Sequence, residues 1–162
     1  MMLLLRMFNK KTRFVIWTEA TYDKASENLN LIKSELLDNQ RLINDFGNQM
    51  TAGQWEQGDF VTQMGSRFLA LGKSQNPRGF LFRQYRPDTI VLNDIDDDEE
   101  CRNGERLDQS WEWLTGGLFG CFGSKLGLVL VANNKIADDC LVERLSNLPA
   151  ADVQIVHLTD DN

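Results

Sequence analysis

The stretch RPDTIVLNDIDDDEECRN, residues 86–103, carries the clearest information about how this chain folds. Its run TIVL, residues 89–92, is continuous and largely apolar, and it stops abruptly in acidic residues: Asp94, Asp96, Asp97, Asp98, Glu99 and Glu100. An apolar run of this length between turn-forming residues is typical of a strand buried on both faces of a parallel sheet. Because ligands bind beyond the carboxyl ends of such strands, the acidic residues mark a candidate functional site.

Strand-like and helix-like segments alternate along the rest of the chain. The patterns predict strands at residues 13–20, 125–134 and 152–158, a hairpin over residues 59–72 turning at Met64 and Gly65, and a short strand within residues 78–85. They predict helices at residues 21–47, capped by Thr21 or Asp23 and ended by Gly47, at 105–122, closing near Gly116 and Gly117, and at 136–148. This alternation predicts one α/β domain spanning residues 1–162, with a mainly parallel sheet flanked by helices.

Composition narrows the class of protein. The 162 residues, 42% of them hydrophobic, suit one domain with a sizeable core, and the net charge of −7 argues against nucleic-acid binding through overall charge. The three cysteines show no CxxC spacing and the histidine is single, so we expect free thiols rather than a zinc site. The N-terminal apolar run is too short to span a membrane, and it precedes its basic residues, unlike a signal peptide. We therefore expect a soluble, cytoplasmic protein.

The acidic stretch has three interpretations. The plainest is a solvated turn. A calcium loop would use Asp94, Asp96, Asp98 and Glu105 at positions one, three, five and twelve, but position six is Glu99 instead of glycine, and a strand precedes the loop instead of a helix. The third is a magnesium site beside a nucleotide, because TIVLND has the form of a Walker B strand, whose terminal carboxylate organises an ion that carries phosphate charge.

An ordered series of segments resembles the ATPase region of the large terminase subunit, the motor that packages DNA into tailed-phage capsids. Residues 13–47 look like the strand and helix that follow the phosphate loop in that family. Residues 55–80 resemble its hairpin, Gly-rich turn and Arg-Gly pair, residues 86–103 its Walker B strand, and residues 126–145 its coupling strand and the helix behind it. The resemblance covers roughly residues 13–148 and implies a partial P-loop NTPase fold.

The resemblance also implies roles at the end of the apolar run. The family usually has two acids there, the first holding Mg²⁺ through water and the second orienting the attacking water. These positions fall on Asn93 and Asp94. Asn93 can accept a hydrogen bond from a metal-bound water but brings no negative charge. We therefore expect Asn93 and Asp94 at the metal, Asp94 as the main catalytic acid, and Asp96 or Asp97 nearer the water, with the register left open.

Further residues are assigned by the same resemblance. Asn133 and Asn134, at the end of the coupling strand, would sense the γ-phosphate, although asparagine is also common where strands exit into turns. Arg78, with Lys73 and Arg83, would offer positive charge to a nucleotide or to a DNA backbone, unless these are solvated loop residues. Trp111, Trp113, Phe119 and Phe122 are expected in the core, since they lack the interleaved basic residues of a base-stacking platform. His157 has no catalytic partner in the sequence.

A phosphate loop is not recognisable in this sequence. The segment RFLALGKS, residues 67–74, ends in the right residues, but Arg67 stands where the first glycine belongs and a turn, rather than a helix, is expected to follow. In the family the phosphate loop precedes the segment that begins here at Arg13, and a nuclease domain follows. We therefore expect an internal part of the motor that lacks both, binds ATP weakly or not at all, and self-associates or fills its open sheet edge with a strand from residues 1–8.

In the complete protein the resemblance implies Mg²⁺ and ATP as cofactors. It implies phage DNA, the small terminase subunit and the portal protein as partners, in the cytoplasm of a bacterial host and away from membranes. Two other functions remain open. One is a non-catalytic α/β interaction module whose acidic loop docks a basic partner. The other is a metal-dependent nuclease, ranked last because its acids are consecutive on one loop.

Overall fold

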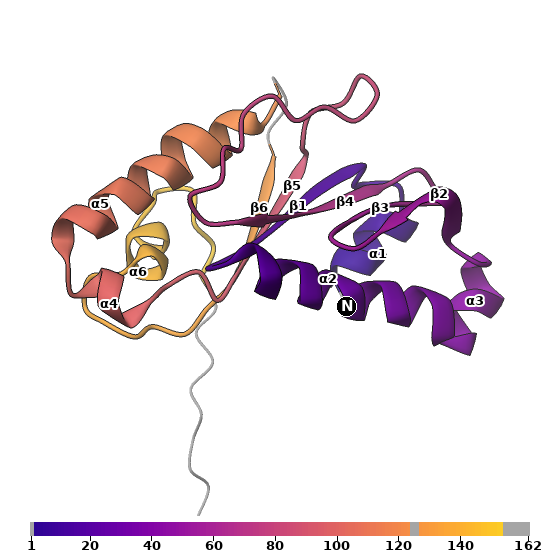
Figure 1. Cartoon of the computed structure of the whole chain (residues 1–162), viewed down its shortest axis with the longest axis horizontal. Coiled ribbons are helices and arrows are strands. Elements are labelled where there is room, and N and C mark those ends of the chain that lie inside the picture. The colour runs from indigo at the N-terminus through magenta and orange to yellow at the C-terminus, as the bar shows by residue number, and fades with distance from the viewer. Residues whose placement is uncertain (1, 124–126, 154–162) are drawn as a thin grey trace, which may run out of the picture.

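The fold is built on one six-stranded, mostly parallel sheet (Figure 1). This computed structural model describes residues 2–123 and 127–153. The strands are β1 (Phe14–Glu19), β2 (Met50–Glu56), β3 (Asp59–Thr62), β4 (Arg67–Gly72), β5 (Thr89–Asn93) and β6 (Leu128–Ala132), in the order β2-β3-β4-β1-β5-β6. Strands β4, β1, β5 and β6 are parallel, and the pairs β2-β3 and β3-β4 are antiparallel. The predicted α/β class is confirmed.

Helices cover both faces of the sheet (Figure 1). One face packs against α1 (Met2–Phe8) and α2 (Tyr22–Asp38), followed by α3 (Gln40–Phe46). The other face packs against α5 (Gly104–Glu112), the π-helix η1 (Trp113–Leu118) and α6 (Leu141–Ser146). The short elements α4 (Asp98–Cys101) and η2 (Phe119–Cys121) lie before and after this helical stretch. The sheet is therefore the middle layer of a three-layer α/β/α arrangement.

Strand β5 lies inside the sheet because its residues are apolar on both faces. Ile90 and Leu92 join the core on the α5 side, while Val91 joins the core on the α2 side. Its neighbour β1 alternates in the same way, with Phe14 and Ile16 on the α5 side. The predicted strands at residues 13–20 and 89–92, the strand within 125–134 and the hairpin over 59–72 are confirmed.

Several predicted elements differ from the observed ones. The helix expected over residues 21–47 is capped by Thr21 as predicted, but it breaks at Asn39, whose side chain caps the start of α3. The helix beginning at Gly104 continues through Gly116 and Gly117, because Leu114 and Leu118 extend its buried face and packing outweighs the glycines. Residues 136–148 form only the short helix α6.

The remaining differences involve the sheet edges and the chain ends. Strand β2 was not predicted, and the segment 78–85 contains only an isolated bridge between Phe82 and Tyr85. The strand expected from residues 1–8 is wrong: this segment is helix α1, because Leu3, Met7 and Phe8 recur at helical spacing and are buried. The expected strand at 152–158 and His157 lie largely outside the described residues. No helix in the described ranges is both long and apolar enough to cross a membrane.

Candidate site at the carboxyl edge of the sheet

The carboxyl ends of β5 and β6 lie side by side. Asn93 is paired with Ala132, and the backbone N–H of Asp94 donates to the carbonyl of Ala132 at 3.0 Å. Just beyond, the side-chain oxygen of Asn133 accepts a hydrogen bond from the backbone N–H of Ile95 at 2.7 Å. The two strand ends therefore meet, which brings Asn133 to the loop that begins at Asp94.

Asp94 occupies an unusual backbone conformation. Its φ is +48°, in the left-handed region, and its side chain is exposed. Non-glycine residues in this region cost free energy and occur preferentially at functional sites, although aspartate tolerates the conformation better than most residues. Within the described parts of the chain no hydrogen bond involves its carboxylate. Asp94 therefore presents a free carboxylate at the edge of the sheet.

Asp96 is bound into the fold. Its carboxylate accepts hydrogen bonds from the backbone N–H groups of Leu141 at 2.7 Å and Val142 at 3.0 Å, and from the side-chain amide of Asn133 at 2.8 Å. Leu141 and Val142 are the first residues of α6, so this carboxylate satisfies N–H groups that have no partner within the helix. Asp96 thus joins the loop after β5 to α6 and to the end of β6.

Asp96 also affects a neighbouring thiol. The Sγ of Cys101 donates to Asp96 at 3.9 Å. Burial, together with the negative charge of Asp96, raises the pKa of Cys101 to about 11. The thiol is therefore protonated at neutral pH and is a poor nucleophile. All three cysteines are free, as the sequence predicts.

Glu19 is a site residue that the sequence interpretation missed. It is the last residue of β1 and is 1% exposed. Its Oε1 accepts three hydrogen bonds, from Trp17 Nε1 at 2.7 Å, from Asn28 Nδ2 of α2 at 2.7 Å and from Asn93 Nδ2 at 2.9 Å. The available signal was an acidic residue closing a buried apolar strand, the same pattern that drew attention to residues 89–94.

Lys73 belongs to an internal ion pair. Its Nζ donates to the carbonyl of Ile95 at 2.9 Å and to the carboxylate of Glu100, whose other oxygen accepts from Ser110 Oγ. Its neighbour Gly72 is required by packing, since a Cβ there would lie 2.4 Å from the backbone nitrogen of Tyr22 at the start of α2. No helix follows Ser74 before β5. The glycine and lysine of LGKS thus have structural partners, consistent with the interpretation that this segment is not a phosphate loop.

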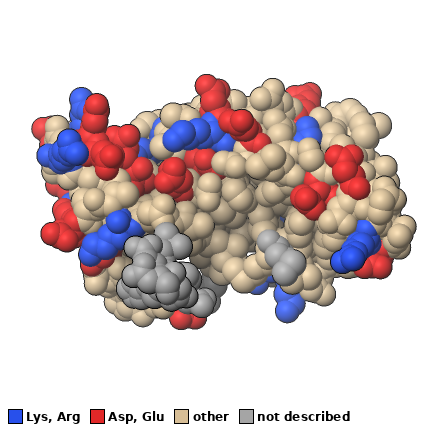
Figure 2. All heavy atoms as spheres, turned by 90° about the horizontal axis from the view of Figure 1, so that it is seen from below, with Lys and Arg blue, Asp and Glu red and all other residues tan. Residues whose placement is uncertain are grey.

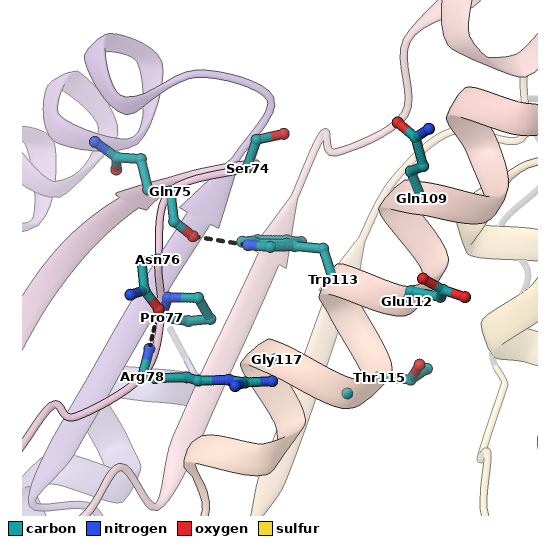
Figure 3. A pocket seen from close by; sticks show the side chains of 11 residues that line it. Ser74, Gln75, Asn76, Pro77, Arg78, Gln109, Glu112, Trp113, Thr115 and Gly117 are labelled. Carbon is teal, nitrogen blue, oxygen red and sulfur yellow. Dashed lines mark hydrogen bonds between the residues drawn. The ribbon is translucent and has the colours of Figure 1, made fainter.

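Arg78 lies apart from the strand ends. It lines a groove of about 660 Å³ between the loop after β4 and the helical stretch from α5 to η1 (Figure 3). In this groove the indole N–H of Trp113 donates to the carbonyl of Gln75 at 2.7 Å. Arg78 is exposed, and in the described ranges no hydrogen bond links it to the residues that end β5 or β6. Arg83 and Asn134 are likewise exposed.

The four predicted core aromatics are packed as expected. The side chains of Trp111, Trp113, Phe119 and Phe122 are partly buried against the core on the α5 side. Phe119 and Phe122 are stacked, with their ring centroids 6.4 Å apart. These rings are therefore part of the hydrophobic layer rather than an exposed platform.

The oxygen ligands available at this edge fit a magnesium ion in part. Asn93 and Asp94 offer an amide oxygen and a carboxylate, which are oxygen ligands of the kind that Mg²⁺ takes. Among the described residues no group of three or more His, Cys, Asp and Glu side chains converges on one point. Magnesium is commonly held by one or two carboxylates together with substrate phosphates and water. Asn93 and Asp94 would therefore supply part of a magnesium site, which water and phosphate would complete.

Charge on the surface is mixed near this edge. Asp97, Asp98 and Glu99 are exposed, and the exposed Arg102 and Arg106 follow them closely. Figure 2 shows acidic and basic atoms gathered together at the end of the molecule where α4 and α5 lie, on the left. Asp97 also caps α4, because its side chain accepts from the N–H groups at the start of that helix. The acidic stretch is therefore divided between structural and exposed residues.

Comparison with known proteins adds no further assignment. A scan against protein-family models and searches of curated proteins and of solved structures each found no match to this chain.

Proposed function

We propose that this chain is a segment of the ATP-hydrolysing motor domain of a large terminase subunit, which powers DNA packaging in the complete protein. The observation that carries the proposal is the pairing of β5 with β6. Their parallel register brings the free carboxylate of Asp94 and the amide of Asn133 to one edge of the sheet. A Walker B strand beside a coupling strand requires this adjacency, because both must act on the same phosphate.

The residues at the edge take different parts in this proposal. Asn93 and Asp94 would hold Mg²⁺ together with the phosphates, and Asp94, whose carboxylate is exposed, would be the catalytic acid. Asp96 is hydrogen-bonded to α6 and to Asn133. In the proposed motor it would link the loop after β5 to the coupling strand. A change at Asn133 when phosphate leaves would then be transmitted to α6.

The open edge of the sheet also supports the proposal. Within the described residues β6 has a neighbour on one side only, and its residues are partly or fully exposed, with Val131 41% exposed. The opposite edge strand, β2, carries a register irregularity and a glycine, Gly53, at φ +72°, devices that discourage further pairing. In the proposed motor a strand bearing the phosphate loop would pair with β6.

A specific observation keeps the interaction module as a second candidate. Asp97, Asp98 and Glu99 are exposed, and none of them forms an ion pair within the described ranges. Such a loop presents negative charge that a basic partner can bind. In this alternative the residues that end β5 and β6 would have no role in binding an ion.

Paramagnetic broadening by Mn²⁺ separates the two candidates in the chain itself. Mn²⁺ takes the same oxygen ligands as Mg²⁺ and broadens nearby amide resonances even when it binds weakly. The motor proposal expects the amides of residues 93–96 and Asn133 to broaden first, and Asp94→Asn to abolish this effect. Broadening confined to residues 97–99 and unchanged by Asp94→Asn would contradict the motor proposal and favour the interaction module.

The chain is expected to release no phosphate from Mg-ATP above the level of an Asp94→Asn control. Phosphoryl transfer depends on positioning and charge neutralisation of the phosphates, and a phosphate loop supplies much of both. The measurement is phosphate release, together with calorimetric titration of a non-hydrolysable ATP analogue. Steady turnover that Asp94→Asn abolishes would show that another part of this chain replaces the phosphate loop.

Strand β6 has one unpaired edge among the described residues, and this edge is expected to make the chain self-associate at high concentration. Unpaired strand edges with apolar side chains pair readily with other chains, and a lysine on such an edge discourages it. Val131→Lys should weaken the association by about tenfold, corresponding to about 1.4 kcal/mol, as measured by sedimentation velocity. Leu31→Lys on α2, which replaces a side chain that is 63% exposed, is the matched control. Equal effects of the two variants would exclude the β6 edge as the contact.

A further inference from the structure

A buried carboxylate lies next to the one position where the sequence lacks an expected acid. Glu19 closes β1 and accepts a hydrogen bond from the side-chain amide of Asn93, which closes the neighbouring strand β5, at 2.9 Å. The two residues are 74 positions apart in the sequence. Both are on the α2 side of the sheet, because Trp17 and Val91, two residues before each of them, contact the core on that side.

The surroundings of Glu19 do not explain why this position carries a charge. Its partners Trp17, Asn28 and Asn93 are neutral donors, and in the described parts of the chain no Lys or Arg pairs with it. The nearby lysine, Lys73, is engaged with Glu100. Burying a carboxylate with neutral partners alone is costly, and a neutral acceptor would satisfy the same donors. The charge is therefore better explained by an electrostatic role at the edge than by stability.

The hydrogen bond also fixes the direction of the Asn93 amide. Since Nδ2 donates to Glu19, the amide oxygen Oδ1 is directed away from Glu19, and within the described ranges no hydrogen bond occupies it. An amide oxygen can accept a hydrogen bond from a water or bind a cation, whereas the amide nitrogen cannot. Glu19 thus orients the one oxygen that Asn93 can offer to an ion.

We infer that Glu19 and Asn93 act as one carboxylate–amide unit, in which Glu19 supplies the negative charge and orients Asn93 towards a divalent cation beside Asp94. Glu19 is a positioning residue, because its Oε1 is taken up by three donors and the ion is bound through Asn93 and Asp94. This inference rests on the proposed function for the presence of the ion. The pairing of the two side chains stands independently of it.

The test moves the carboxylate from one strand to the other. Four forms of the full chain are compared: wild type, Glu19→Gln, Asn93→Asp and the double variant. Asn93→Asp places two carboxylates at hydrogen-bonding distance and should lower the urea midpoint in metal-free buffer at pH 7. The double variant restores one carboxylate and one amide in the reverse order and should recover most of that loss. Equal urea midpoints for Asn93→Asp and the double variant would show that Glu19 and Asn93 do not act as a pair.

The second measurement is Mn²⁺ broadening of the amides of residues 94–96 and Asn133. Glu19→Gln should weaken apparent Mn²⁺ binding by about tenfold, the effect typical of residues that orient metal ligands. The double variant should restore it. Asp98→Asn removes the same charge from an exposed position on the same loop and is the matched control, for which we expect no more than about a twofold change. A loss in Asp98→Asn equal to that in Glu19→Gln would reduce the effect to general electrostatics and overturn the role of Glu19.

The two measurements also separate this inference from the proposed function. If Mn²⁺ does not broaden residues 94–96 and Asn133 in the wild-type chain, both the proposed function and the binding of a cation at this edge are contradicted, whatever the urea midpoints are. Broadening that is present and unchanged by Glu19→Gln supports the proposed function and overturns the inference. Broadening that is lost in Glu19→Gln and regained in the double variant supports both.

Discussion

Lys73→Ala is expected to destabilise the protein by about 3 kcal/mol, the cost of breaking a buried ion pair by removing one partner. The side chains of Lys73 and Glu100 are 9% and 15% exposed. Without the ammonium group, the Glu100 carboxylate keeps, among the described residues, only Ser110 as a hydrogen-bond donor, and the carbonyl of Ile95 loses its side-chain donor. Most of the lost stability therefore comes from the negative charge of Glu100, which stays largely buried without a positively charged partner.

Urea denaturation of the wild type and the variant measures this loss. Lys135→Ala is the control, because Lys135 pairs with Glu143 on the surface and is 52% exposed. Exposed pairs contribute little, so this variant should unfold at nearly the same urea concentration as the wild type. Adding Glu100→Gln to Lys73→Ala should recover part of the stability, since no uncompensated charge remains. A Lys73→Ala midpoint equal to that of Lys135→Ala would show that the pair contributes nothing.

Asp96→Ala is expected to destabilise the protein by about 2–3 kcal/mol, because hydrogen bonds to a charged acceptor are stronger than neutral ones. The substitution removes the acceptor of two backbone N–H groups at the start of α6 and of the amide of Asn133. Hydrogen exchange at Leu141 and Val142 should accelerate in step with the loss of stability, since these amides lose their partner.

The matched control for Asp96 is Asp97→Ala. Asp97 caps α4 through the N–H groups of Glu99 and Glu100, so it performs the same kind of contact at the neighbouring position. That helix has four residues, none of them fully buried, and removing its cap should cost about 1 kcal/mol or less. Unfolding curves that are the same for both variants would mean that α6 is held by its apolar contacts, Leu141 and Leu145, and not by Asp96.

The parts of the fold that were predictable are those with strong local patterns. The apolar runs that form β1, β5 and β6 predicted the parallel sheet, and the turn at Met64 and Gly65 predicted the hairpin of β3 and β4. Strand β2 was missed because it is an exposed edge strand with little apolar alternation. Helix α1 was expected to be a strand because a short apolar run has no reliable period, and its burial against the α2 side is a tertiary effect.

The candidate site was predictable where strand ends alone define it. Parallel pairing brings Asp94 and Asn133 together once β5 and β6 are recognised. The contacts of Glu19 with Asn93 and of Lys73 with Glu100 were not predictable, because they join residues far apart in the chain. In the sequence, Asn93 stands where the resemblance implies an acidic residue. The fold brings a carboxylate to it from another strand, which no local pattern indicates.

The central position of β1 has a consequence for how the chain folds during synthesis. This strand is made early, yet one of its two neighbours, β5, ends at Asn93, 74 residues after Glu19. Until that segment has left the ribosome, one edge of β1 is unpaired, and the helices α5, η1 and α6 that cover the face of Phe14 and Ile16 follow later still. Folding dominated by such distant pairings takes about milliseconds to seconds in small domains. The first half of the chain should therefore depend on the second half to complete its core, and cutting the chain within residues 79–86 should yield two pieces that fold only together.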